Sequence, residues 1–310
     1  MKTPAFALAI LLLIPPANQA QDPESYRISV NVDLVVLQAT ARDRKGRLVS
    51  DLRERDFQVY EDGVRQAIRL FRHEDIPVTV GLVIDHSGSM HSKLPEVIAA
   101  ARTFVQTSNP EDLLFVVNFN EKVTLGLPAA MSFTNRPEEL ERAISSVPAL
   151  GMTALYDAVA VSLRRLQEGG DRKVLIVISD GGDNASKHSL DEVLKMAEQS
   201  SALIYTIGIL DVAEPDRNPG VLRRLAQVTG GEAFFPGELN EVVAICERIA
   251  RDIRHQYTIG YVPTSSAQPG VFRAIRVVAG GTADGKLQVR ARSGYIAGGA
   301  QRPVKPEIAK

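Results

Sequence analysis

The segment Val78–Met90, VTVGLVIDHSGSM, constrains the fold of this chain more than any other stretch. Its residues up to Ile84 are almost all apolar and lack the polar alternation of a strand with one face in solvent. Such a run is typical of a strand buried on both faces, as in a parallel sheet. The polar residues after it cannot continue the strand, so Asp85 is expected at its carboxyl end. In open α/β sheets that edge is where ligands bind.

Residues 76–253 repeat this pattern. Further apolar runs occur at Leu113–Val117, Val174–Ile178 and Leu203–Ile209. Helical apolar faces lie between them, in segments that contain Leu94 to Phe104, Leu155 to Leu166, Leu190 to Ala197, Leu222 to Ala226 and Val242 to Ile253. Alternating strands and helices predict a doubly wound, mostly parallel sheet with helices on both faces.

The flanking segments, residues 27–75 and 256–297, are predicted to be β structure. Alternating apolar residues predict strands at Ile28–Leu34, Leu48–Leu52, Phe57–Tyr60, Ala67–Phe71, Tyr257–Tyr261, Phe272–Val277 and Leu287–Ala291. The Asp62-Gly63 pair predicts a hairpin turn. Each segment is too small to bury a core alone. We therefore expect the two to pair into a small β-sandwich, with the α/β domain inserted between them.

The two ends of the sequence differ from the rest. Lys2, the apolar run Ala5–Ile14 and Pro15-Pro16 predict a signal peptide over residues 1–20, cleaved near Ala20. An uncleaved anchor is the alternative, although the apolar run is short for a membrane span. We expect an exported protein, in the periplasm, on the cell surface or secreted, without stable membrane insertion after cleavage. Residues 298–310 are expected to be a disordered tail.

Charge and cysteine content narrow the function classes. The formal net charge is −1 and no block of like charge stands out, so nucleic acid is not an expected partner. Cys246 is the only cysteine, which excludes an internal disulfide. It lies on a helical apolar face and is expected to be a buried structural thiol.

Polar residues gather at three places that the predicted fold brings together. Asp85, Ser87 and Ser89 follow the first strand, Thr153 precedes a helix, and Asp180 follows the strand Val174–Ser179. If these two strands are neighbours, both carboxylates lie at one sheet edge, with Thr153 above them. Carboxylate and hydroxyl oxygens are the ligands that Mg²⁺ prefers. The alternative is local hydrogen bonding, with Asp180 in a turn and Thr153 as a helix cap.

These five residues carry a resemblance to a known family. They match the pattern D-x-S-x-S, T, D of the metal-ion-dependent adhesion site in the von Willebrand factor A-type (VWFA) domain. The resemblance covers about residues 76–253. The whole chain is also similar to the acidobacterial VWFA-related domain family, through VSDLRERDFQVYEDGVRQAIRLF before the domain and YTIGYVP, FRAIRV and VRARSGY after it.

The resemblance implies a role for each residue. Ser87 and Ser89 would bind the ion directly, Thr153 directly or through water, and Asp85 and Asp180 largely through water. Mg²⁺ is the expected ion, with Mn²⁺ or Ca²⁺ possible. Three neutral hydroxyls leave the ion incompletely neutralised, so an Asp or Glu of a protein partner is the expected ligand.

Three nearby residues are expected to stay outside the site. His86 and His91 could be zinc ligands, but two oxygens and no thiolate nearby do not suit zinc. Both are therefore expected to be solvated loop residues. Asp183 is expected to be exposed, with a supporting role in the site as the alternative.

The leading hypothesis is an exported, metal-dependent protein-binding module and not an enzyme. A structural or assembly protein with a vestigial metal site is one alternative. The other is a Mg²⁺-dependent phosphoryl-transfer enzyme with Asp85 as nucleophile. Ser87 stands where such enzymes need a second carboxylate, and no Gly-rich phosphate loop occurs.

Overall fold

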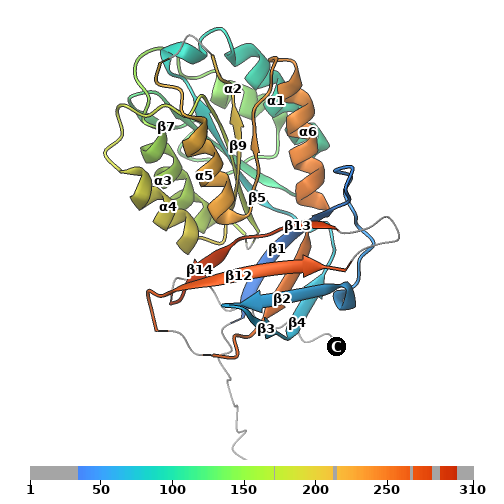
Figure 1. Cartoon of the computed structure of the whole chain (residues 1–310). Helices are drawn as coiled ribbons and strands as arrows, with labels where there is room; N and C mark the ends of the chain where they lie inside the picture. Colours follow the sequence, from blue (N-terminus) through green and yellow to red (C-terminus); the bar gives the residue numbers. More distant parts are fainter. Residues whose placement is uncertain (1–33, 171, 212–214, 266–267, 281–286, 299–310) are drawn as a thin grey trace, which may run out of the picture. The chain divides into compact units, whose positions relative to one another are not determined.

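The computed structural model describes residues 34–170, 172–211, 215–265, 268–280 and 287–298. Within them, the α/β region forms a sheet with the strand order β10-β9-β8-β5-β6-β7 (Figure 1). The strands are β5 (Thr79–Asp85), β6 (Leu113–Phe119), β7 (Val123–Leu125), β8 (Lys173–Ser179), β9 (Leu203–Gly208) and β10 (Ala233–Phe234). Only the pairing of β6 with β7 is antiparallel among these described strands. Every residue of β5 is buried, as its apolar sequence predicts.

Helices cover this sheet in two layers (Figure 1). They are α1 (Leu94–Thr107), α2 (Pro137–Ile144), α3 (Leu155–Arg165), α4 (Leu190–Gln199), α5 (Pro219–Thr229) and α6 (Glu241–Arg254). Helix α1 packs against α2 and α6, whereas α4 packs against α3 and α5. The predicted doubly wound, mostly parallel sheet is therefore confirmed. The sequence did not predict α2 or the short edge strands β7 and β10.

The flanking β segments pair with each other into two antiparallel sheets of the described chain, β13-β1-β11-β4 and β14-β12-β2-β3. Their strands are β1 (Val35–Arg42), β2 (Phe57–Glu61), β3 (Val64–Gln66), β4 (Ile68–Arg72), β11 (Tyr257–Tyr261), β12 (Phe272–Ala279), β13 (Gln288–Arg290) and β14 (Gly294–Ile296). Each sheet combines strands from before and after the α/β region, and residues of both sheets share one apolar core. The expected sandwich is confirmed.

Several local expectations differ from the structure. Leu48–Leu52 forms no strand, and only Leu48 bridges to Arg42. Asp62 and Gly63 turn the β2–β3 hairpin with positive φ angles of 47° and 81°, as predicted. The strand expected to return from this turn, Ala67–Phe71, instead forms β4 and pairs with β11, and the returning strand is the unpredicted β3. β14 was not predicted. The signal peptide, most of the strand Ile28–Leu34 and the tail beyond residue 298 lie outside the described residues. No helix in the described ranges is long and apolar enough to cross a membrane.

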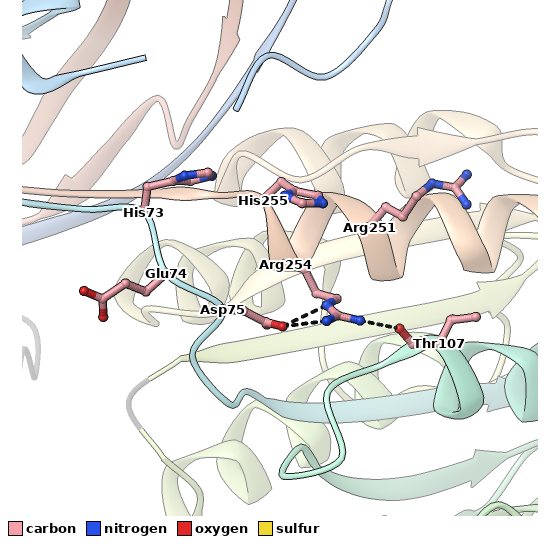
Figure 2. A pocket seen from close by; sticks show the side chains of 7 residues that line it. All are labelled: His73, Glu74, Asp75, Thr107, Arg251, Arg254 and His255. Carbon is pink, nitrogen blue, oxygen red and sulfur yellow. Dashed lines mark hydrogen bonds and ion pairs between the residues drawn. The ribbon is translucent and has the colours of Figure 1, made fainter. Parts of the chain in front are cut away.

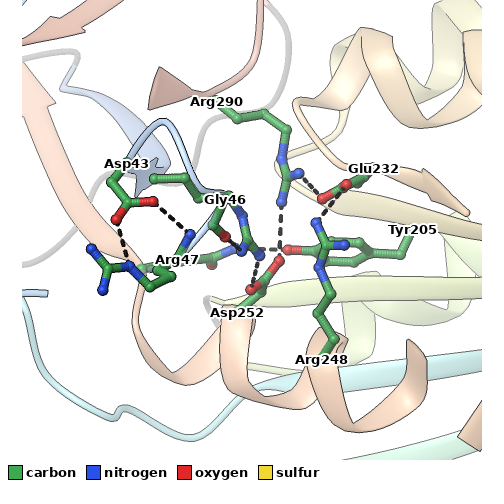
Figure 3. A network of polar contacts seen from close by, with 10 residues as sticks. Asp43, Gly46, Arg47, Tyr205, Glu232, Arg248, Asp252 and Arg290 are labelled. Carbon is green, nitrogen blue, oxygen red and sulfur yellow. Dashed lines mark hydrogen bonds and ion pairs between the residues drawn. The ribbon is translucent and has the colours of Figure 1, made fainter. Parts of the chain in front are cut away.

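A polar network joins the sandwich to the α/β region at the end of α6 (Figure 3). Asp252 of α6 is fully buried and pairs with Arg42 of β1 and Arg290 of β13. Arg290 also pairs with Glu232, which accepts from Arg248 of α6 at 2.8 Å. Buried charges are stable when paired and hydrogen-bonded, so each carboxylate here is neutralised by guanidinium groups.

The chain crosses between the sandwich and the α/β region through residues 73–78 and 255–256. These crossings line a pocket of about 260 Å³ together with α1 and α6 (Figure 2). His73 and His255 contribute one ring each, with centroids 6.4 Å apart. Arg254 donates from Nε to Asp75 at 2.9 Å and from a terminal nitrogen to the Thr107 carbonyl at 3.2 Å. The two crossings are thus fixed to each other and to the end of α1.

Candidate functional site

Asp85 ends the central strand β5, directly beside the end of β8. The parallel register pairs Ile84 with Ile178, which places Ser179 next to Asp85. The Ser179 hydroxyl donates to Asp85 Oδ2 at 2.6 Å, and the Ser87 backbone N–H donates to Asp85 Oδ1 at 2.8 Å. The Asp85 side chain thus joins the end of β5 to β8 and to the loop that follows β5.

Ser87, Ser89 and Asp180 are in direct contact. The Ser89 hydroxyl donates to Asp180 Oδ2 at 2.8 Å, and the Ser87 and Ser89 hydroxyl oxygens lie 3.2 Å apart. Asp180 Oδ1 accepts from the Gly182 backbone N–H at 3.0 Å. Gly181 has a φ of +83°, and a Cβ there would lie 2.4 Å from the Asn218 carbonyl oxygen. Glycine is therefore needed to turn the chain here and keep Asp180 at the edge.

The loop before α3 holds Thr153 next to the same edge. Its backbone is hydrogen-bonded to the first loop through Gly88 N–H to Gly151 C=O at 3.2 Å. The Thr153 N–H donates to Asn184 Oδ1 at 2.9 Å, and the Asn184 N–H donates back to the Thr153 carbonyl at 3.0 Å. The structure therefore connects the three stretches that the sequence singled out.

Thr153 does not act as the helix cap. The cap position of α3 is Ala154, and Asp183 and Ser186 accept the N–H groups of Tyr156 and Asp157 at 2.9 and 3.0 Å. Within the described part of the chain, the Thr153 hydroxyl makes no hydrogen bond. This hydroxyl is therefore available to a ligand.

The site contains two buried carboxylates. Asp85 is fully buried and Asp180 is 5% exposed. Burial raises the pKa of Asp85 to about 6, and the charge of Asp180 adds to the rise, while hydrogen bonds from Ser179 and Ser87 oppose it. Among the described residues, neither carboxylate forms an ion pair with Lys, Arg or His, and both accept only from hydroxyl and backbone N–H groups.

The donor set fits a hard divalent cation. Its side-chain donors are all oxygen, and a cation would compensate the two buried charges. In the described ranges, no three His, Cys, Asp or Glu side chains gather as a metal cluster. The hydroxyls of Ser87, Ser89 and Thr153 would therefore be essential to binding.

His86 and Asp183 differ from the sequence predictions. His86 is fully buried, with Nε2 3.1 Å from Asn118 Oδ1, and burial lowers its pKa. The expectation of a solvated His86 is wrong, because its backbone N–H and C=O join β6 to the Thr153 loop. Asp183 is half-buried and caps α3 instead of being merely exposed. His91 is exposed as expected.

Sequence reasoning missed two residues that hold the site together. Ser179 could have been found, because the parallel register of β5 and β8 places it beside Asp85. Asn184 carried no signal, since its bond to Thr153 joins two irregular loops. Cys246 is buried, as expected, and burial raises the pKa of its thiol to about 12.

Comparisons with known proteins define the class of domain. The family model described as "von Willebrand factor type A domain" matches residues 80–182. A solved von Willebrand factor type A structure from Catenulispora acidiphila is 14% identical with a TM-score of 0.51, covering 78% of this chain and 73% of that one. Proximal thread matrix protein 1 from the mussel byssus, solved "with zinc occupied MIDAS motif", is 15% identical with a TM-score of 0.50. That match covers 63% of this chain and half of the mussel chain. No curated protein sequence matches.

The chain contains a von Willebrand factor type A domain. The family match includes β5 and β8, and the domain's sheet carries the proposed ligands Asp85 and Asp180. The resemblance to the acidobacterial VWFA-related family remains a prediction.

Proposed function

We propose that this protein is a metal-dependent protein-binding module. Asp85, Ser87, Ser89, Thr153 and Asp180 would hold one Mg²⁺, with Mn²⁺ or Ca²⁺ as substitutes. The observation that carries the proposal is a pair of buried carboxylates with no positively charged partner among the described residues. Leaving such charges uncompensated is costly, and a bound cation removes that cost.

The proposed ligand set also determines what the site would bind. Ser87, Ser89 and Thr153 are neutral, and the two carboxylates would act largely through water. An ion held in this way keeps positive charge toward solvent and attracts a carboxylate. The partner would therefore be a protein that presents Asp or Glu. The metal-occupied motif of the mussel protein supports divalent binding in this fold.

Binding suits this site better than catalysis. The Ser87 and Ser89 hydroxyls are committed to each other and to Asp180, and Asp85 accepts from Ser179 and Ser87. The Ser89 hydroxyl does donate to the Asp180 carboxylate, but no Lys, Arg or His of the described residues pairs with that carboxylate to stabilise a developing charge. We also propose that the protein works outside the cytoplasm, on the basis of the predicted signal peptide over residues 1–20.

Calorimetry with Mg²⁺ and Mn²⁺ tests the metal site. We expect one ion per chain, and no binding by Asp85→Ala or Thr153→Ala variants that keep the circular dichroism spectrum of the parent. Asp191→Ala is the matched control, because that side chain is 90% exposed on α4. Absence of binding by the parent chain would favour a structural protein with a vestigial site.

A pull-down from an extracellular or periplasmic fraction tests partner binding. Capture should require Mg²⁺, disappear with EDTA and fail with Thr153→Ala. A partner retained equally in all three conditions would contradict the metal-dependent mechanism.

A further inference from the structure

Two large apolar side chains are exposed on the loop that carries Thr153. Leu150 and Met152 are each 52% exposed, although most large apolar residues of this domain are buried. They flank Gly151, whose carbonyl accepts from Gly88, the residue between Ser87 and Ser89. Both side chains therefore emerge beside the proposed metal ligands.

The loop backbone fixes these two residues in their exposed positions. The Leu150 N–H donates to the His86 carbonyl at 2.9 Å, and the Ala154 N–H donates to the Asn120 carbonyl at 2.8 Å. Gly151 adopts a φ of +86°, a conformation that disfavours other residues. These bonds hold the backbone of Leu150 and Met152 at the surface, where both side chains are exposed. Neighbouring exposed apolar side chains form a small apolar surface, and such surfaces serve as contact sites more often than single exposed residues do.

An acidic side chain lies between them. The Glu121 carboxylate packs so closely over Gly151 that a Cβ there would lie 1.9 Å from Oε2. Glu121 belongs to the exposed turn after β6, so its charge faces the same rim. A partner that brought several carboxylates to this rim would be repelled by it. A single carboxylate can approach the ion while its neighbours contact the apolar side chains.

We infer that the site selects a protein segment in which one Asp or Glu is flanked by apolar residues, in preference to a polyacidic segment. This inference rests on the proposed function, because the ion must supply the attraction for the carboxylate. Leu150 and Met152 would contact the flanking residues, and Glu121 would exclude further acidic ones. An anionic membrane surface fits less well, since Glu121 repels it and the apolar rim is small.

Fluorescently labelled peptides test this selection by anisotropy with the full chain. The central tripeptide is Leu-Asp-Leu, Gly-Asp-Gly or Asp-Asp-Asp between identical Ser-Gly-Ser ends. With Mg²⁺ we expect the Leu-Asp-Leu peptide to bind about tenfold more tightly than Gly-Asp-Gly, because apolar area is buried. The Asp-Asp-Asp peptide should bind no better than Gly-Asp-Gly. EDTA should abolish all binding.

Variants separate this inference from the proposed function. In Leu150→Ser/Met152→Ser the preference for Leu-Asp-Leu should vanish while Mg²⁺ affinity is retained, and Glu121→Gln should improve Asp-Asp-Asp binding several-fold. Val64→Ser, at a 57% exposed apolar residue of the sandwich, is the control. It should change neither the preference for Leu-Asp-Leu nor the binding of Asp-Asp-Asp. Equal binding of all three peptides, with Mg²⁺ bound, overturns the selection and leaves the metal-binding function standing. Absence of Mg²⁺ binding overturns both.

Discussion

Two of the places where the described α/β region buries carboxylates have surroundings that are opposite in kind. At the end of α6, Asp252 is fully buried between Arg42 and Arg290. At the carboxyl edge of the sheet, Asp85 is just as buried, but it accepts only from Ser179 and Ser87. The first arrangement is neutralised within the protein, whereas the second would, under the proposed function, be neutralised by a bound cation. Burial alone therefore does not identify a ligand-binding carboxylate, and its partners have to be compared as well. Asp112 is also buried and accepts from the backbone N–H groups of Val78 and Asn109, but it stands alone, whereas Asp85 and Asp180 lie at one sheet edge.

Removing Asp252 should have the largest effect. Asp252→Ala leaves Arg42 and Arg290 without their shared carboxylate, and breaking a buried pair costs about 3–5 kcal/mol. Urea unfolding should show this loss in the free energy of unfolding. Glu247→Ala, on the same helix with an exposed partner at 3.8 Å, should cost less than about 0.5 kcal/mol. Equal effects of the two variants would show that the network contributes no more than a surface pair.

Neutralising Asp85 should raise the free energy of unfolding of the metal-free chain, whereas removing Asp252 should lower it. In EDTA at pH 8 the parent chain keeps a carboxylate whose pKa burial has raised to about 6. Asp85→Asn removes this charge at nearly the same size, and the Ser179 hydroxyl can turn to accept from the new NH2 group, so the variant should stabilise the metal-free chain by about 1–3 kcal/mol. Added Mg²⁺ should raise the melting temperature of the parent but not of the variant. A variant less stable than the parent in EDTA would show that Asp85, like Asp252, is a structural carboxylate that stabilises the fold.

Loosening Thr153 should weaken the metal site without unfolding the chain. Asn184→Ala removes the acceptor of the Thr153 N–H, and loss of such a supporting contact lowers metal affinity about tenfold or more. Calorimetric titration with Mg²⁺ measures this change. Asn240→Ala, at an exposed position before α6, is the control. Unchanged affinity in Asn184→Ala would mean that the loop is held by its backbone alone.

The smallest expected effect is a change in pH dependence at the pocket between the two crossings. Burial lowers the pKa of His73 below its usual value of 6.5, and His255 adds to this. Protonating His73 is harder in the folded state than in the unfolded chain. Its contribution to stability is therefore fully present above pH 6.5 and is lost as the pH falls below that value. The pocket also contains Glu74, Asp75, Arg251 and Arg254, which set the local charge (Figure 2).

Melting curves at pH 7.5 and 5.5 measure this contribution. His73→Gln should lose less stability on acidification than the parent. His91→Gln, at an exposed histidine, should lose as much as the parent. An equal drop in melting temperature in all three proteins would show that His73 does not contribute to the loss of stability at low pH.

The sequence predicted the parallel sheet well because its signals are local. The uninterrupted apolar run of β5 and the polar residues after it specify a buried strand and its end. The juxtaposition of Asp85 and Asp180 followed from the expected strand order, which the structure confirms. The short elements β3, β7, β10 and β14 escaped prediction because two or three residues carry too little periodic signal.

The supporting contacts were harder to predict. His86 was expected to be a solvated loop residue, yet long-range bonds to Asn118 and the Thr153 loop bury it. Likewise, the exposure of Leu150 and Met152 depends on a loop conformation fixed by hydrogen bonds from three other segments. Such contacts depend on the assembled fold and leave no pattern in neighbouring residues.

The pairing of β1 with β11 has a consequence for the order of folding. Val35 is aligned with Tyr261, so the two sandwich sheets cannot form until the whole α/β region has been synthesised. The β2–β3 hairpin can close early, because Glu61 pairs with Val64 nearby. Strands β1 and β4 keep unpaired edges until β11 and β13 have been synthesised. The α/β region can fold before that and bring the two crossings together. Slow synthesis of residues 257–296 would therefore prolong an aggregation-prone intermediate in which the α/β region is native and the sandwich is not.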